Sequence, residues 1–173
     1  MLLRDHSPPT AKGGFTLIEL MISLVLLSIF SVIAQQAWNT IIPRYRVKVA
    51  TADIHSLIRK ARADALSQGQ QLLCDGERGC SRFETTGIIH VGHDRDRDGQ
   101  LSDTEITEAY RLPDGVTVTW KRFRGNALMF GHRGIAHFQN GSFYVCSTHS
   151  AKRIVMNWIG RPRIETATLE DCQ

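Results

Sequence analysis

The sequence predicts an α+β protein in which one long N-terminal helix packs on antiparallel β-sheets. Two observations support this fold class. Residues 15–69 follow a helical pattern, apolar at first and amphipathic later, which ends at Gly69. Residues 70–173 instead alternate short β-like runs with turn residues. A chain of 173 residues holds one domain of ordinary size with an attached segment.

The first part of the predicted helix, residues 15–43, is long enough to cross a bilayer. No charged side chain occurs from Leu20 to Pro43, and a helix of this length spans about 30 Å of hydrocarbon. Glu19 is the exception, because a carboxylate in lipid is costly unless it finds a partner. A secretory signal peptide cleaved near Ala34 is the alternative, but the early acidic residue and the longer helical pattern argue against it.

The second part of the helix, residues 44–69, is amphipathic. Its apolar residues recur at spacings of three and four: Val47, Ala50, Ile54, Leu57, Ile58, Ala61, Ala65 and Leu66. This face suits packing against a sheet, and Pro43 is expected to dent the helix where the two parts meet.

Eight β-like runs follow, separated by turn signals such as Asn140-Gly141. They are Gln71–Cys74, Gly87–Gly92, Glu105–Leu112, Val116–Phe123, Ala127–Phe130, Ile135–Phe138, Ser142–Ser147 and Arg153–Ile159. The predicted β-rich domain therefore covers residues 70–173.

The segment Gly14-Phe15-Thr16-Leu17-Ile18-Glu19-Leu20 follows a short leader with basic residues and opens the apolar helix. It closely resembles the class III signal of type IV pilins and type II secretion pseudopilins. The resemblance implies that a prepilin peptidase removes residues 1–14 by cleavage after Gly14, and that Phe15 becomes N-methylated. It also implies that Glu19 pairs with the N-terminal amine of a neighbouring subunit, which would relieve the cost of burying the carboxylate.

Leader, helix and β-rich domain together resemble the GspH/FimT family of minor pilins, most closely the FimT type. Residues 58–65 are similar to the helical stretch of that family before its first strand. The resemblance implies a type IV pilin-like fold and other pilin or pseudopilin subunits as partners. It also implies a single-pass protein of the bacterial inner membrane, with a periplasmic C-terminal domain that enters a pilus or pseudopilus.

The cysteines Cys74, Cys80, Cys146 and Cys172 favour two disulfides in an exported domain. Three connectivities are possible. Cys74 and Cys80 flank a short turn-like stretch, which makes a local bridge easy and would leave Cys146 to pair with Cys172. The spacing does not match a usual zinc site.

The acidic segment from Asp94 to Glu105 has the spacing of a twelve-residue calcium loop. The candidate ligands are Asp94, Asp96, Asp98, Gln100 and Glu105, with Gly99 at the sixth position. A strand-like run precedes the loop where a calcium-binding helix–loop–helix motif has a helix, and Arg95 and Arg97 reduce its negative charge. The favoured interpretation is a turn without a cofactor, since the resembled family often has an Asp- and Gly-rich turn here. Calcium is the alternative.

A basic block occupies residues 111–163, which contain nine Lys and Arg against one Asp. By composition alone, a solvated basic face is the simplest explanation. Within this block, Gly160-Arg161-Pro162-Arg163 stands out. Proline keeps the segment extended, so Arg161 and Arg163 should point the same way and could contact successive phosphates.

Gly-Arg-x-Arg near the C-terminus resembles the DNA-binding motif of FimT-type minor pilins, which act in natural transformation. The resemblance implies double-stranded DNA as a partner, with Gly160, Arg161 and Arg163 at the site and Lys152 and Arg153 in support. Trp158 is expected in the core, although stacking on DNA together with His149 is an alternative. A structural pseudopilin at the tip of a type II secretion pseudopilus remains the competing hypothesis.

The histidines fall into no recognisable catalytic or zinc pattern, and no glycine-rich phosphate loop follows a strand. The sequence therefore predicts an assembly and binding protein rather than an enzyme.

Overall fold

The computed structural model describes residues 14–136 and 139–172. It divides into two compact units at the boundary between Ala37 and Trp38. Of the expected leader, residues 1–14, all but Gly14 lie outside the described residues.

Helix α1 covers Leu17–Gln68 and is the predicted long helix. Its N-terminal part is long and apolar enough to cross a membrane. Pro43 lies inside α1 without ending it, although it removes one backbone donor. The helix stops before Gly69, whose φ of +100° suits glycine and few other residues.

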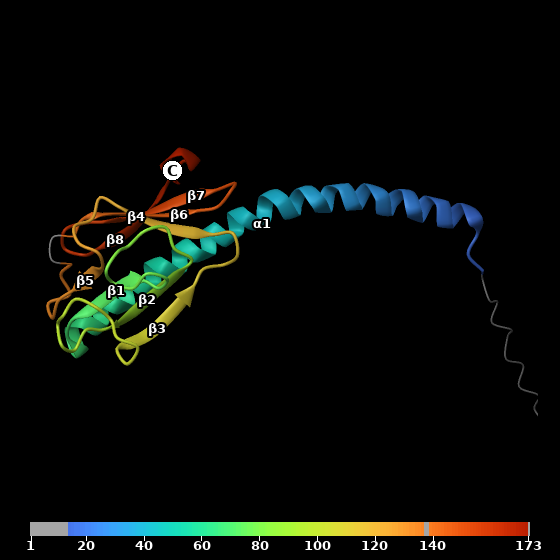
Figure 1. Ribbon diagram of the computed structural model, residues 1–173. Coiled ribbons are helices and arrows are strands. Elements are labelled where there is room, and N and C mark those ends of the chain that lie inside the picture. Colours follow the sequence, from blue (N-terminus) through green and yellow to red (C-terminus); the bar gives the residue numbers. More distant parts are fainter. Residues whose placement is uncertain (1–13, 137–138, 173) are drawn as a thin grey trace, which may run out of the picture. The chain divides into compact units, whose positions relative to one another are not determined.

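Two four-stranded antiparallel sheets follow α1 (Figure 1). The first sheet has the order β3-β2-β1-β5 and is built from β1 (Gln71–Asp75), β2 (Ile88–His93), β3 (Ile106–Arg111) and β5 (Leu128–Phe130). The second sheet has the order β4-β6-β7-β8 and is built from β4 (Thr117–Lys121), β6 (Gly141–Cys146), β7 (Ala151–Met156) and β8 (Pro162–Thr166). A short 3-10 helix, η1 (Leu169–Cys172), follows β8. The expected α+β fold class, one long helix packed on antiparallel sheets, is confirmed.

The main core lies between the amphipathic face of α1 and the inner faces of both sheets. Its members include Ile54 and Ile58 of α1, Leu73, Ile89 and Phe130 of the first sheet, and Val118, Phe143 and Ile154 of the second. All of these side chains are fully buried, and each stabilises the fold by about 1.5–3 kcal/mol relative to exposure. A second cluster covers the outer face of the first sheet around Leu72, Cys74 and Cys80, so β1 is buried on both faces.

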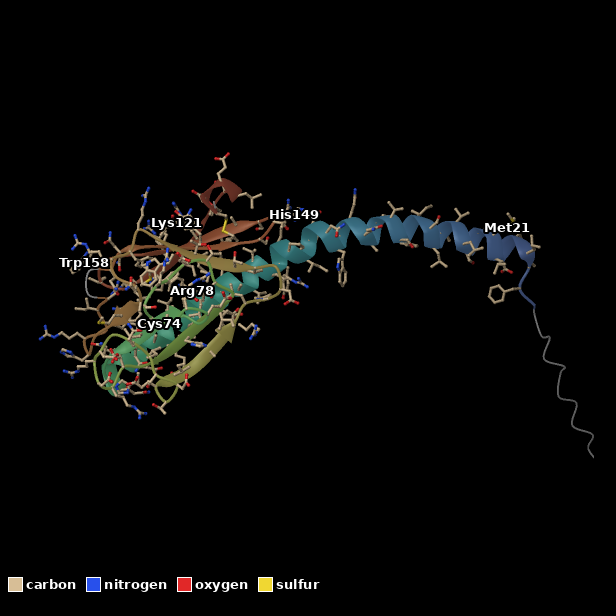
Figure 2. The ribbon with its side chains drawn as sticks, viewed as in Figure 1. Met21, Cys74, Arg78, Lys121, His149 and Trp158 are labelled. Carbon is tan, nitrogen blue, oxygen red and sulfur yellow. A yellow bond between two sulfur atoms is a disulfide. The ribbon has the colours of Figure 1, made fainter. Side chains whose placement is uncertain are left out.

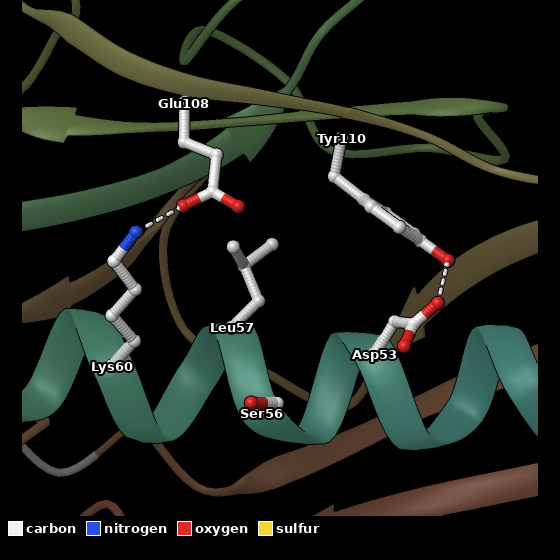
Figure 3. Close-up of a pocket in the computed structure, with 6 residues that line it drawn as sticks. All are labelled: Asp53, Ser56, Leu57, Lys60, Glu108 and Tyr110. Atoms are coloured by element: carbon white, nitrogen blue, oxygen red, sulfur yellow. Dashed lines mark hydrogen bonds and ion pairs between the residues drawn. The ribbon is translucent and has the colours of Figure 1, made fainter.

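Two polar contacts tie α1 to β3, an edge strand of the first sheet (Figure 3). Lys60 Nζ lies 2.6 Å from Glu108 Oε2, and the Tyr110 hydroxyl donates to Asp53 Oδ2 at 2.8 Å. Leu57 lies between them and lines the same small pocket. Both contacts are exposed, so they position the strand more than they stabilise the domain.

The strand predictions for the chain from Ile135 onward need three corrections. β8 was not among the predicted strands. The run predicted over Arg153–Ile159 ends at Met156, because Asn157 begins a turn. In the run predicted over Ile135–Phe138, Ile135 and Ala136 belong to no strand, while residues 137 and 138 lie outside the described residues.

Candidate nucleic-acid interface

The turn between β7 and β8 positions the arginine motif. The Asn157 carbonyl accepts the Gly160 N–H at 2.9 Å, and its side-chain Oδ1 accepts the Arg161 N–H at 2.7 Å. Gly160 has a φ of +80°, and a Cβ there would lie 2.7 Å from Cε1 of Phe130. Glycine is therefore required both by the turn and by close packing against β5.

Arg161 and Arg163 are both exposed. Arg161 directly precedes β8, and Arg163 is its second residue. Val155 is the register partner of Arg163, and Met156 that of Pro162. Side chains alternate along an extended chain, so Arg163 lies on the outer face of the second sheet and the same alternation assigns Arg161 to that side. Within the described residues Arg161 has no ion pair, whereas Arg163 Nε lies 2.6 Å from Glu165 Oε1.

Arg153 faces the same side from β7, directly opposite Glu165. Its Nη2 lies 2.6 Å from Glu165 Oε2, so one carboxylate bridges Arg153 and Arg163. The hydrogen bond from Arg153 and the positive charges of both guanidinium groups lower the pKa of the Glu165 carboxyl, against a smaller opposing effect of desolvation. Two of the arginines assigned to DNA are thus partly neutralised within the sheet.

Lys152 is not brought together with these arginines. It precedes Arg153 directly, so its side chain leaves the opposite face of β7. It pairs in register with Thr166, at the far end of β8 from Pro162. Lys152 and Arg153, predicted as a supporting pair, therefore belong to different surfaces.

Trp158 lies in the β7–β8 turn and is 56% exposed, so the expectation that it belongs to the core is wrong. His149 lies in the turn between β6 and β7. Figure 2 shows the two side chains at opposite ends of the second sheet. The two side chains expected to stack together on DNA therefore do not lie together.

A second basic loop lies at the same end of the sheet. Lys121, the last residue of β4, pairs with Ser142 near the start of β6, and Gly141 pairs with Met156 at the end of β7. These pairings bring the exposed Arg122 and Arg124, which follow β4, to the end of the sheet that carries the β7–β8 turn. We call this surface the basic end; it comprises Arg122, Arg124, Trp158, Arg161 and Arg163.

Sequence reasoning noted Arg122 and Arg124 as members of the basic block but did not place them at the site. Only the order β4-β6-β7 brings them near a turn more than thirty residues later. The order of strands in a sheet depends on long-range pairing, which spacing along the chain does not encode.

The four cysteines form two disulfides, Cys74–Cys80 and Cys146–Cys172. This is the pairing expected from the turn-like stretch between the first two. The second bridge spans 26 residues and fixes η1 beside β6 and β7. The chain that follows β8 is thereby held against the same sheet that carries the basic end.

At the N-terminus, Gly14 and Phe15 are exposed, and Glu19 closes a capping box with Thr16. Glu19 Oε2 accepts the Thr16 N–H at 3.0 Å and the Thr16 hydroxyl at 3.1 Å, while the Glu19 N–H donates to Thr16 Oγ1. Glu19 therefore has a local role in the first turn of α1 that the sequence analysis did not include. Its pairing with the N-terminal amine of a neighbouring subunit stays a prediction.

The five candidate calcium ligands do not all converge. Oxygens of Asp94, Asp96 and Asp98 lie within 4.8 Å of one another. The Gln100 N–H donates to Asp98 Oδ1, and Glu105 accepts hydrogen bonds from Arg95 and Ser102. Three of the five predicted residues thus form a cluster, and the other two support its loop.

Comparison with known proteins agrees with this fold. Residues 50–160 match the family described as type II transport protein GspH, and residues 10–34 match the prokaryotic N-terminal methylation motif. Two crystal forms of the Pseudomonas aeruginosa type IV minor pilin FimU are similar structures. They have TM-scores of 0.52 and 0.50 at 15% and 16% identity, covering 72% and 71% of this chain and 90% and 94% of theirs. A search of curated proteins finds no match.

Proposed function

The chain belongs to the type II transport protein GspH family, and from that membership we propose that it is a minor pilin that binds double-stranded DNA at its basic end. The family and the methylation motif identify a membrane-anchored subunit of the type IV pilin and pseudopilin class. Proteins of this class assemble with other pilin subunits after processing by a prepilin peptidase. The DNA ligand and a role in natural transformation are our proposal.

Arg161 carries the proposal. It is exposed, its backbone is held by Asn157, and it forms no ion pair within the described part of the chain. A guanidinium group that extends from a fixed backbone position and is not neutralised is well suited to a phosphate oxygen. Arg163, two residues on, lies on the same face at a spacing suited to the next phosphate.

The remaining members of the basic end extend the same surface. Arg122 and Arg124 add positive charge from the β4–β5 loop, and Trp158 offers an aromatic surface beside Arg161. The four arginines of the basic end are exposed and offer their charge to phosphate oxygens. Binding should therefore depend on phosphate charge, be independent of sequence and weaken steeply with salt.

The proposed location is the bacterial inner membrane, with α1 crossing once and the domain from Trp38 onward in the periplasm. The two disulfides support an oxidising compartment for that domain. Cleavage after Gly14 and methylation of Phe15 would precede entry into the filament. In this arrangement, the basic end is available to DNA that reaches the pilus from outside.

A mobility-shift titration of the mature chain in detergent with duplex DNA tests the proposal. We expect Arg161→Gln/Arg163→Gln to weaken binding at least about tenfold and to reduce the salt slope by about two. Arg161→Gln alone should cost more than Arg163→Gln, because Arg163 already pairs with Glu165. The matched control is Arg95→Gln/Arg97→Gln, which removes the same charge from an exposed loop of the first sheet and should leave binding near the wild-type value.

The proposal is overturned if the wild-type chain does not shift duplex DNA at low salt. Equal losses in the two double variants would show only a dependence on net charge, and the assignment to the basic end would be wrong.

The second candidate is a structural pseudopilin in a type II secretion system, and it is favoured by the match to a family of type II transport proteins. In that case, the basic end would contact an acidic surface of a partner subunit or of secreted cargo. Loss of protein secretion, with normal DNA uptake, in cells carrying Arg161→Gln/Arg163→Gln would support this candidate over the first.

A further inference from the structure

The loop between β2 and β3 brings its two ends together. The His93 N–H donates to the Glu105 carbonyl at 3.1 Å, and the Asp94 N–H donates to the Gln70 carbonyl at 3.1 Å. Gly92 permits the closure, because a Cβ there would lie 2.3 Å from the Glu105 carbonyl oxygen. The backbones of the first and twelfth residues of the loop, Asp94 and Glu105, are therefore close together.

Three carboxylates meet inside this closed loop. One oxygen from each of Asp94, Asp96 and Asp98 lies within 4.8 Å of the other two. Calcium binds oxygen at 2.3–2.6 Å, so ligands on opposite sides of one ion are about 5 Å apart. The three oxygens are thus close enough to share a single calcium ion without rearrangement of the backbone.

Asp94 supplies the independent sign of a missing ligand. Its side chain is only 1% exposed. Oδ2 accepts hydrogen bonds from Gln70 Nε2 at 2.6 Å and from the Gly99 N–H at 3.1 Å. Oδ1 is buried and has no hydrogen-bond partner in the described part of the protein. A buried carboxylate oxygen without a donor is costly, and a cation beside it would remove that cost.

The cluster also lacks a compensating positive side chain. Among the described residues, no Lys, Arg or His forms an ion pair with Asp94, Asp96 or Asp98. Arg95 and Arg97 reduce the net negative charge of the loop sequence, but both side chains are exposed. Like charges at this separation repel one another unless a counter-ion is present.

We propose that the β2–β3 loop binds one calcium ion through Asp94, Asp96 and Asp98. Water completes the oxygen shell. Glu105 keeps a supporting role, because its carboxylate accepts the Arg95 N–H at 2.8 Å, the Ser102 N–H at 3.1 Å and the Ser102 hydroxyl at 2.8 Å. Three acidic ligands on a surface loop suit the weak affinity of extracellular calcium modules, with a Kd of about 10⁻⁴–10⁻³ M.

Calorimetric titration of CaCl₂ into the mature, metal-free chain in detergent tests the proposal. We expect one site and a rise in Tm at saturating calcium. Asp96→Asn/Asp98→Asn should weaken binding at least about tenfold, since it removes the negative charge of two of the three acidic ligands. Both residues are exposed, and circular dichroism without calcium checks that the variant folds.

Asp103→Asn is the matched control, because Asp103 is exposed in the same loop but does not belong to the cluster. It should keep the affinity within about twofold of wild type, since it removes no ligand. The proposal is overturned if wild-type chain gives neither heat nor a Tm shift at about 10 mM calcium, well above the expected Kd. It is also overturned if Asp103→Asn weakens binding as much as Asp96→Asn/Asp98→Asn does.

Discussion

Glu165 sets the electrostatic balance of the outer face of the second sheet. It is the carboxylate that holds Arg153 and Arg163 in place. Phosphate at the basic end would compete with Glu165 for Arg163, but not for Arg161. The two arginines of the Gly-Arg-Pro-Arg motif are therefore unequal, although their spacing in the sequence makes them look equivalent.

The lowered pKa of Glu165 gives a pH-dependent contribution to stability. The folded carboxyl titrates below its unfolded value of about 4.3, so its stabilising effect is complete above that pH and declines as pH falls through the folded pKa. We expect the difference in unfolding free energy between wild type and Glu165→Gln to shrink as pH is lowered from about 5 to about 3. Urea titrations across this range measure it, and a constant difference would contradict the assignment.

Individual side chains were the least predictable level from sequence. Lys152 and Arg153 are adjacent in the chain, but only a known strand at Ala151–Met156 reveals that they point to opposite faces. The sequence predicts Trp158 in the core because tryptophan side chains are, on average, largely buried. Asn157 instead caps a turn that exposes it, and an asparagine followed two residues later by Ile-Gly was the available signal.

At the scale of elements, the β7–β8 turn depends on Gly160. Alanine there would meet both a strained φ of +80° and Phe130 at 2.7 Å. We expect Gly160→Ala to lower the unfolding free energy by roughly 2–4 kcal/mol. Urea denaturation measures this change.

Gly115→Ala separates the two causes. Gly115 has a similar φ of +75°, but a Cβ there would meet nothing within 4 Å. This variant should lose only about 1 kcal/mol, from backbone strain alone. Equal losses in the two variants would mean that packing of the turn against Phe130 contributes nothing.

The elements themselves were largely predictable, for physical reasons. The three- and four-residue spacing of apolar side chains predicted α1, and Gly69 predicted where the helix ends. β8 was not predicted because Pro162 is its first residue and its side chains are mostly polar or exposed. Both features are typical of an edge strand, which β8 is in the second sheet. The order of strands in the second sheet brings the residues of the basic end together. It depends on pairing between distant parts of the chain, so the local sequence pattern could not predict it.

At the scale of the whole molecule, the chain separates two tasks. The segment up to Ala37 carries the signal for processing and assembly, and the unit from Trp38 onward carries both candidate binding surfaces. Glu19 lies in the first of these segments. Its capping box with Thr16 means that a loss of assembly in Glu19→Ala would have two explanations, a missing charge or a frayed helix start.

Glu19→Gln resolves this ambiguity, because glutamine can still close a capping box but carries no charge. If Glu19 pairs with the N-terminal amine of a neighbouring subunit, the Glu19→Gln protein should still fold and insert into the membrane. It should nevertheless enter filaments far less often than wild type. Thr16→Ala is the complementary control, since it removes the hydroxyl partner and keeps the carboxylate. Quantifying each variant in sheared, purified filaments measures incorporation. Normal incorporation of Glu19→Gln, with a defect only in Thr16→Ala, would assign Glu19 to helix capping alone.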